Sequence, residues 1–305
     1  MPSPASLPGI WPALLTPLNA DLSIDHGRLV SHSKKLLAAG CGGVTPFGTT
    51  GEGPSFSVAE RRAAVDALIA GGVPASKILV STSCAALPET VELTQHALEV
   101  GAWGSLILPP FYLKGVSDAG IVDCYRWIVD RIGDARLRIM LYHIPQVTGV
   151  PLSAAVIEEL VTRYPGTFVG IKDSAGDRAH SLMLADRFMD RLTVHVGHEP
   201  DLPTLGRRGS TGAVSGLANF MPRVVHRLVA SPDAPGTPAD FARIEALLGV
   251  LGGYALIPAL KAIMAQLDRD PAWLRVRPPL VATTPDRSAE LERQLRAVAL
   301  DPARD

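Results

Sequence analysis

The 305-residue sequence lacks a large excess of charge of one sign, because 29 lysines and arginines face 30 aspartates and glutamates. Without a basic field a protein has little attraction for nucleic acid or an anionic membrane, so we expect a small ligand instead. Cysteines are also few, and Cys41, Cys84 and Cys124 stand far apart with no metal-ligand spacing. This odd, scattered set argues against a disulfide framework and favours a reducing cytoplasm.

Long apolar runs are missing as well. No uncharged apolar run reaches membrane-spanning length, and the N-terminal stretch Met1–Pro8 has no basic segment followed by an apolar one. We therefore expect neither export nor membrane insertion. What the sequence does have is a hydrophobic content of 47%, enough to bury a large core in one barrel-sized domain or two smaller ones.

Short apolar or β-branched runs alternate with longer stretches of helical spacing, and this alternation indicates a parallel sheet. The predicted strands are Gly9–Leu15, Gly43–Phe47, Lys77–Ser81, Ser105–Leu108, Arg138–Tyr142, Thr167–Lys172, Leu192–Gly197 and Gly212–Ser215. About eight such strands fit a closed α/β barrel, the (β/α)8 or TIM barrel, better than most open sheets.

Helix signals fill the intervals between these strands. Ser57-Val-Ala-Glu60 has the form of a capping box, and Ser117 and Ser153 are suitable N-caps. After the eighth strand, helical patterns cover residues 219–230, 240–266 and 288–300, with a Pro-rich break at 231–238. We therefore predict a catalytic barrel over residues 1–230 and a C-terminal helical extension over residues 231–305.

The segment Phe168-Val-Gly-Ile-Lys172-Asp173-Ser174 is a buried type of strand that ends in a lysine. Catalytic groups of a (β/α)8 barrel sit at the C-terminal ends of its strands. Burying an ammonium is costly, which favours the neutral amine, and the neutral amine is a nucleophile. The alternative is a structural lysine whose stem packs at the rim and whose head pairs with Asp173.

Tyr142 ends another apolar strand and is followed by His143-Ile-Pro145. A phenol near a lysine amine can move protons between substrate and solvent, as imine formation requires. Taken alone, Tyr142 fits a core aromatic with a satisfied hydroxyl better than a proton shuttle, and we expect a structural hydrogen bond for His143.

The loop Phe47-Gly48-Thr49-Thr50-Gly51-Glu52-Gly53 follows the second predicted strand. Its two hydroxyls and glycine-exposed N–H groups can hold a small carboxylate without a basic side chain. The lysine of a Walker motif is absent, so this is not a nucleotide loop, although such a turn can also be only a tight connection. Glu52 can hold the loop by accepting backbone N–H groups.

Together, Gly48-Thr49-Thr50-Gly51-Glu52, Tyr142-His143-Ile-Pro145 and Gly170-Ile-Lys172-Asp173 resemble the dihydrodipicolinate synthase / N-acetylneuraminate lyase family of class I aldolases. The likeness runs from about Gly9 to Asn219, and the family's C-terminal helices suit the remaining tail. The resemblance implies that Lys172 forms an imine with pyruvate, that Thr49 and Thr50 sit by the pyruvate carboxylate, and that Tyr142 shuttles protons.

The resemblance also implies a homotetramer, a dimer of dimers, in which a tyrosine reaches into the neighbouring subunit's site. Pro110-Phe111-Tyr112 matches that stretch, so Tyr112 would join Thr49 and Tyr142 across the interface. The alternative for Tyr112 is an exposed loop aromatic.

Two departures from the family pattern bear on the substrate. A dihydrodipicolinate synthase is expected to carry an arginine two residues after the Pro of its Tyr-Asn-x-Pro segment, but Val147 stands there and His143 replaces the Asn. A lost guanidinium removes an anchor of roughly 1.5–3 kcal/mol for the aldehyde's carboxylate. Lysine biosynthesis is therefore disfavoured.

The family's substrate-tail contacts correspond here to Ser174 and to Glu199 in the loop Gly197-His198-Glu199, and a backbone carbonyl that lines the family's pocket corresponds to the end of the eighth strand at Val214. A hydroxyl and a carboxylate suit a polyhydroxylated tail better than a second carboxylate, although Glu199 can also be a solvated loop end.

We therefore expect a Schiff-base lyase that cleaves or condenses pyruvate with an aldehyde, best suited to a 2-keto-3-deoxy sugar acid. Lys172, Tyr142, Thr49 and Tyr112 would be catalytic, with Thr50, Gly48, Ser174, Glu199 and Val214 binding substrate. No metal or organic cofactor is needed, because the protonated imine is the electron sink. The alternatives are a dihydrodipicolinate synthase, a family dehydratase, and a barrel that binds a 2-oxo acid without turnover.

Overall fold

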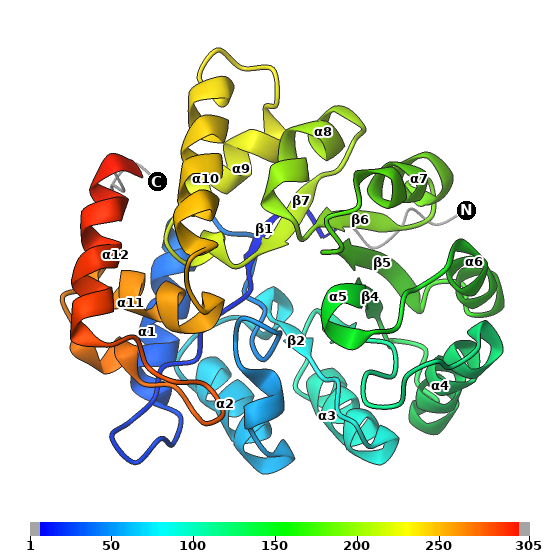
Figure 1. Ribbon diagram of the computed structural model, residues 1–305. Coiled ribbons are helices and arrows are strands. Elements are labelled where there is room, and N and C mark those ends of the chain that lie inside the picture. Colours follow the sequence, from blue (N-terminus) through cyan, green and yellow to red (C-terminus); the bar gives the residue numbers. More distant parts are fainter. Residues whose placement is uncertain (1–6, 299–305) are drawn as a thin grey trace.

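The computed structural model describes residues 7–298 and has parallel strands surrounded by helices (Figure 1). The seven strands are β1 Gly9–Pro12, β2 Leu79–Ser81, β3 Gly104–Ile107, β4 Ile139–His143, β5 Phe168–Asp173, β6 Thr193–Val196 and β7 Gly212–Ser215. They pair in the order β1-β7-β6-β5-β4-β3-β2, so every pair except β1–β7 joins consecutive strands. The predicted domain ranges 1–230 and 231–305 also include residues 1–6 and 299–305, which lie outside the described part of the chain.

The second predicted strand, Gly43–Phe47, is a shorter extended segment in the structure, and this segment closes the barrel. It makes single parallel bridges, Ala13 with Thr45 and Val44 with Ile78, so it lies between β1 and β2. The prediction of a full strand is too long, because Pro46 has no N–H to donate and Phe47 turns into the left-handed region at φ 64°. With this segment in place the fold is the predicted (β/α)8 barrel.

Helices follow the strands and form the outer layer in Figure 1. They are α1 His26–Ala38, α2 Val58–Ala70, α3 Leu87–Glu99, α4 Asp118–Ile132, α5 Pro145–Thr148, α6 Ala154–Arg163, α7 Arg178–Phe188, α8 Leu202–Arg207, α9 Pro222–Ala230, α10 Thr237–Leu251, α11 Leu256–Leu267 and α12 Pro285–Val298. The capping box at Ser57 and Glu60 is confirmed at the start of α2, and Ser117 and Ser153 cap α4 and α6 as predicted.

The C-terminal helices α10, α11 and α12 pack together on one side of the barrel, where α10 also contacts α9 and α11 lies next to α1 (Figure 1). The helical pattern predicted over residues 240–266 is split in two, because the chain turns at Gly252 and Gly253 and the two helices meet at 117°. Within residues 7–298 no single helix is long and apolar enough to cross a membrane, and this bent pair passes only by length and composition. The last two residues of the predicted helix 288–300 lie outside the described residues.

Alternate residues of each strand face opposite layers, and this alternation positions the site. The barrel interior is filled by a cluster of apolar side chains that includes Trp11, Leu79, Leu106, Met140 and Tyr142. The intervening residues face outward and join the cores beneath the helices, as Leu141 and Ile171 do. On β4 and β5, Tyr142 pairs in register with Lys172, and His143 pairs with Asp173. Neighbouring residues therefore face two different environments.

Candidate active site

Lys172 and Tyr142 lie together at the C-terminal ends of β5 and β4, inside the barrel. Lys172 is 4% exposed, and its Nζ lies 4.1 Å from the centroid of the Tyr142 ring. Within residues 7–298 no carboxylate lies at ion-pair distance from Lys172, so the alternative in which it pairs with Asp173 does not fit this geometry. A buried amine beside a phenol is placed for nucleophilic attack and proton transfer.

The predicted carboxylate loop adjoins this pair. The Gly51 N–H donates to Gly48 O over 3.1 Å, which closes a tight turn with Thr49 and Thr50 at its centre. The Thr49 hydroxyl lies 3.2 Å from the Tyr142 hydroxyl. Among the described residues neither the Thr49 nor the Thr50 N–H donates to another group, so both donors are available to a ligand. The turn can therefore present backbone and hydroxyl donors to a small anion.

A cavity of about 260 Å³ opens beside Thr49 and Tyr142. Loop residues of the barrel line one part of it, and Ile257, Pro279 and Leu280 of the C-terminal segment line another. Residues from the barrel loops and from the C-terminal segment thus line this cavity together.

Ser174 and Gly197 crowd against Lys172. The Ser174 hydroxyl is buried and has no hydrogen-bond partner among the described residues. A Cβ added to Gly197 would overlap that hydroxyl and lie 2.9 Å from Lys172 Cε. Ser174 is therefore a neighbour of Lys172 with an unused donor and acceptor, as a substrate-binding residue requires.

Glu199 and Val214 are placed at the β7 side of the barrel. Glu199 Oε1 accepts a 2.6 Å hydrogen bond from the Ser215 hydroxyl, at the end of β7, so this side chain is not a free loop end. Val214 is buried in the interior cluster. Thr50 reaches the same side, since a Cβ on Gly216 would lie 3.3 Å from its hydroxyl.

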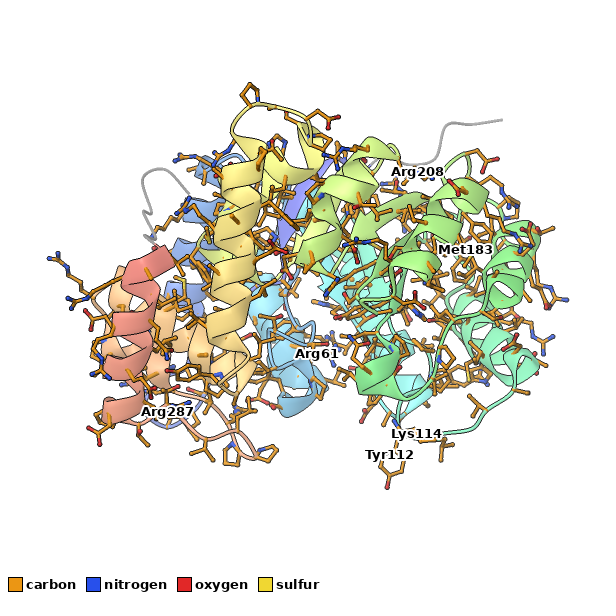
Figure 2. All side chains as sticks on the ribbon, turned by 45° about the horizontal axis from the view of Figure 1, so that its top comes forward. Arg61, Tyr112, Lys114, Met183, Arg208 and Arg287 are labelled. Atoms are coloured by element: carbon orange, nitrogen blue, oxygen red, sulfur yellow. The ribbon has the colours of Figure 1, made fainter. Side chains whose placement is uncertain are left out.

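Tyr112 is the one predicted catalytic residue that this chain does not bring to its own site. Its side chain is 77% exposed and projects away from the barrel near Lys114 (Figure 2). Val147 is also exposed, at 55%, on the short helix α5 beside the cavity.

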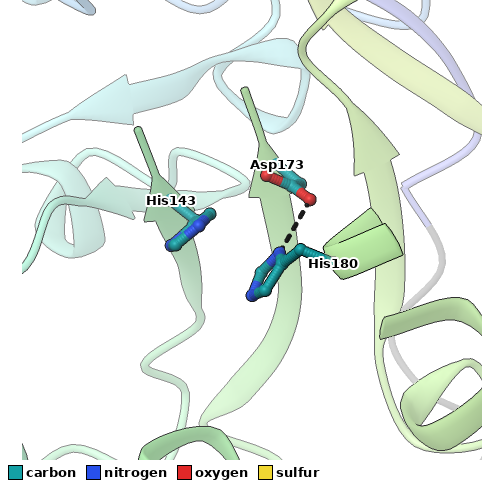
Figure 3. A group of neighbouring side chains, drawn as sticks. All are labelled: His143, Asp173 and His180. Atoms are coloured by element: carbon teal, nitrogen blue, oxygen red, sulfur yellow. Dashed lines mark hydrogen bonds and ion pairs between the residues drawn. The ribbon is translucent and has the colours of Figure 1, made fainter. Parts of the chain in front are cut away.

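The outward-facing His143 and Asp173 of the same strands form a polar cluster with His180 of α7 (Figure 3). Asp173 Oδ2 accepts from His180 Nδ1 at 3.0 Å and from the Ser181 hydroxyl at 2.7 Å. His143 Nδ1 accepts from the Leu152 N–H at 3.0 Å, the structural hydrogen bond that the sequence suggested. Every member thus has a defined partner.

The protonation of this cluster follows from its contacts. Burial and the adjacent His180 lower the pKa of His143 to about 4, so His143 is neutral. Burial opposes the charged form of His180, but the hydrogen bond to Asp173 outweighs it and raises the pKa of His180. Although ligand atoms of the three residues lie within 4.8 Å, the two imidazole rings stack at 4.2 Å. A metal must lie in the plane of each ligating ring, so stacking fits a hydrogen-bonded network better than a metal centre.

Sequence reasoning missed two buried residues of this region. Lys261 of α11 forms an ion pair with Glu52, and both side chains are fully buried. His195 of β6 pairs in register with Lys172, and its Nε2 lies 2.7 Å from Leu7 O. A signal for Lys261 was present, because it is the only charged residue in the otherwise apolar helix Leu256–Leu267.

Comparison with known proteins agrees with this arrangement. The family model described as the dihydrodipicolinate synthetase family matches residues 6–298. An uncharacterized DapA-like lyase of Chloroflexus aurantiacus is 36% identical over 84% of this chain and 85% of its own. The crystal structure of dihydrodipicolinate synthase from Agrobacterium tumefaciens has a TM-score of 0.90 and 34% identity, covering 95% of this chain and 99% of that one.

YagE of Escherichia coli is a further relative, named as a putative 2-dehydro-3-deoxy-D-gluconate aldolase and 30% identical over 73% of this chain and 74% of its own. Its crystal structure in complex with pyruvate has a TM-score of 0.87 and 25% identity, covering 97% of this chain and 100% of that one. The matched region includes the whole barrel and the three motifs around Thr49, Tyr142 and Lys172. The chain therefore belongs to the dihydrodipicolinate synthetase family.

Proposed function

We propose that this protein is a class I aldolase in which the Lys172 amine forms an imine with pyruvate or a related 2-oxo acid. The observation that carries the proposal is the buried contact between Lys172 Nζ and the Tyr142 ring, with the Tyr142 hydroxyl beside that of Thr49. Membership of a family of lyases and aldolases supports it. So does the pyruvate bound to YagE.

The proposed reaction proceeds through an imine on Lys172, with Tyr142 as the group that moves protons. The neutral Lys172 amine adds to the 2-oxo carbon, and loss of water gives the protonated imine. In the cleavage direction the bond between C3 and C4 breaks, its electrons enter the imine as an enamine, and the C4 hydroxyl loses its proton as the aldehyde leaves. Protonation of C3 and hydrolysis then release pyruvate and the amine. Tyr142 is the group placed to carry the hydroxyl proton.

The carboxylate of the 2-oxo acid is assigned to the turn at Gly48, Thr49 and Thr50. Two unused N–H groups and the Thr50 hydroxyl supply donors without a buried cation. Such binding orients the 2-oxo carbon toward the amine, which makes attack effectively intramolecular.

Borohydride trapping tests this proposal directly. Incubation with pyruvate and borohydride should add one reduced pyruvate to the intact chain, located at Lys172 by peptide mass spectrometry. A barrel that binds 2-oxo acids without turnover through non-covalent contacts would gain no mass, and that result would overturn the aldolase proposal.

For the substrate we propose a 2-keto-3-deoxy sugar acid. The free Ser174 hydroxyl beside Lys172 and the Glu199 carboxylate offer hydrogen bonds that suit a polyol tail. The similarity to YagE, with its printed name as a sugar-acid aldolase, supports the same class.

The second candidate is 4-hydroxy-tetrahydrodipicolinate synthase, favoured by the 34% identity to the Agrobacterium synthase. A comparison of kcat/KM for glyceraldehyde and for aspartate semialdehyde at fixed pyruvate separates the two, with Val147→Arg alongside. We expect glyceraldehyde to be preferred, and Val147→Arg to shift the ratio toward the semialdehyde. A preference of the unmodified protein for the semialdehyde by about tenfold or more would replace the sugar-acid proposal. Formation of a dehydrated product without aldehyde release would indicate the family dehydratase.

We further propose a homotetramer in which Tyr112 completes the neighbouring subunit's site. Its exposure and its position after Pro110 and Phe111 support this assignment. Mixing inactive Tyr112→Phe with inactive Lys172→Ala subunits should restore some activity, because a hybrid pairs an intact lysine with an intact neighbouring tyrosine. Verified hybrids without activity would exclude the shared site.

A cytoplasmic location is proposed with it. Cys41, Cys84 and Cys124 are all unpaired, as a reducing compartment allows. No metal or organic cofactor is proposed, because the protonated imine accepts the electron pair.

A further inference from the structure

A fully buried ion pair joins the C-terminal helices to the carboxylate turn. The Lys261 ammonium of α11 contacts Glu52 Oε1, and neither side chain is exposed. Lys261 Nζ also donates to Arg275 O over 2.7 Å, and the Arg277 N–H donates to Glu52 Oε2 over 3.3 Å. Among residues 7–298, the polar contacts of the Glu52 carboxylate thus come from the C-terminal segment, far along the sequence from the turn.

Glu52 has a backbone conformation that is unfavourable for a residue with a side chain. Its φ of 58° and ψ of 29° lie in the left-handed region, which residues with a Cβ rarely occupy. Since surrounding contacts must stabilise such a conformation, its ion pair and its hydrogen bond are the candidates to do so.

The backbone of Glu52 is directly connected to the proposed site. The Glu52 N–H donates to Thr49 O over 3.2 Å, and Thr49 in turn has its hydroxyl 3.2 Å from that of Tyr142. A change in the backbone of Glu52 therefore displaces the residue that carries the proposed carboxylate donors.

The need to pack α11 against the barrel does not explain why Lys261 and Glu52 form a buried ion pair. Leu260, Ile263 and Met264 of the same helix are buried in the large core cluster, so α11 is already anchored by apolar side chains. Burial lowers the pKa of Lys261, although Glu52 opposes the shift, so the pair carries a desolvation cost. Apolar residues of similar volume would hold the helix at least as well. What the charges add is a fixed position for Glu52.

We propose that Lys261 is a positioning residue that acts through Glu52 to hold the turn of Gly48, Thr49 and Thr50 in its carboxylate-binding conformation. This inference rests on the proposed function, because the turn matters only if it binds the 2-oxo acid.

The experiment separates positioning from stability with a paired substitution. Lys261→Met alone leaves a buried carboxylate without its cation, so it should lower the melting temperature. Adding Glu52→Gln removes that charge while its amide oxygen can still accept from the Arg277 N–H, so the double variant should regain much of the lost stability. The measured quantities are the melting temperature, the pyruvate concentration that gives half-maximal borohydride trapping, and the extent of trapping at saturation.

We expect the double variant to melt near the unmodified protein and to require about tenfold more pyruvate, while trapping at saturation stays near complete. Glu52→Gln alone provides a second variant with the same expected shift, because the buried Lys261 can then lose its proton. Asp240→Asn is the control, since it breaks the 2.7 Å ion pair with Arg227 between α9 and α10 and should leave pyruvate binding unchanged.

The inference would be overturned if the folded double variant, or folded Glu52→Gln, binds pyruvate like the unmodified protein. The ion pair would then contribute to folding only. A different result identifies failure of the proposed function: in that case the unmodified protein itself is not trapped by pyruvate and borohydride.

Discussion

The polar side chains on the two faces of β4 and β5 differ in whether they have hydrogen-bond partners within the protein. Tyr142 and Lys172 face the barrel interior, where the lysine has no described carboxylate partner and the tyrosine hydroxyl has the Thr49 hydroxyl as its one described hydrogen-bond partner. One residue further along each strand, His143 and Asp173 face the helices and have defined hydrogen-bond partners. Strand parity therefore separates side chains that keep hydrogen-bonding capacity for a ligand from side chains whose polar groups are already satisfied.

The largest expected effect comes from the inner face. Lys172→Ala should abolish pyruvate trapping completely, because no other amine occupies its position. The protein should stay folded, because the Lys172 side chain makes no ion pair or hydrogen bond within the described residues. Lys35→Ala, which removes an exposed lysine paired with Asp268, should trap pyruvate normally. One added pyruvate on the Lys172→Ala protein by mass spectrometry would place the nucleophile elsewhere.

Tyr142→Phe should lower kcat by roughly 10²–10⁴-fold, the range for loss of a general acid or base. Pyruvate binding should change much less, because the turn remains. Tyr125→Phe is a matched control on the outer side, where a buried hydroxyl donates to Ile107 O over 3.2 Å. It should cost about 1 kcal/mol of stability and leave kcat unchanged. Equal turnover by the two variants would contradict the inner-face role of Tyr142.

Gly197→Ala should disturb the inner face through packing. The new Cβ would overlap the Ser174 hydroxyl and lie 2.9 Å from both Asp173 O and Lys172 Cε. Overpacking of this kind typically costs about 1–3 kcal/mol, and it should slow imine formation by displacing Lys172. Gly249→Ala, in α10 with no heavy atom within 4 Å of its added Cβ, should instead stabilise by up to about 1 kcal/mol. Denaturant midpoints and trapping rates would show whether the two substitutions differ in this way.

The smallest effect is expected on the outer face and depends on pH. Because the pKa of His143 falls from 6.5 to about 4 on folding, its stability contribution is full above pH 6.5 and is lost as the pH falls toward 4. His143→Asn should therefore lessen acid destabilisation in that window. His180 has a raised pKa, so its contribution is full below the unfolded value of 6.5 and is lost as the pH rises through the folded one. Urea unfolding midpoints should be measured across pH for both variants and the unmodified protein. His143→Asn should differ from the unmodified protein mainly between pH 4 and 6.5, and His180→Gln mainly above pH 6.5. The same pH dependence for both variants would contradict the two different protonation states.

The barrel and the inner face were predictable from sequence because their signals are local. Alternating runs and the capping box at Ser57 indicate the elements, and the lysine and tyrosine stand at the ends of apolar strands. The pairing of Glu52 with Lys261 was not predictable, since it depends on where a distant helix packs. The strand predicted around Val44 and Thr45 was too long because the composition of the segment favours a strand. Pro46 limits the hydrogen bonds that the segment can form with its neighbours.

The late position of Lys261 has a consequence for how the protein is made. During synthesis Glu52 leaves the ribosome long before α11 does, so the barrel's first loops form while their buried cation is still missing. On the positioning role proposed for Lys261, the turn would reach its final conformation only after the C-terminal helices dock. A nascent or truncated chain that ends within the barrel would therefore carry Lys172 but hold an unsettled carboxylate turn. With the roles proposed for Lys172, Glu52 and Lys261, reactivity toward 2-oxo acids would therefore arise only after the C-terminal helices have folded onto the barrel.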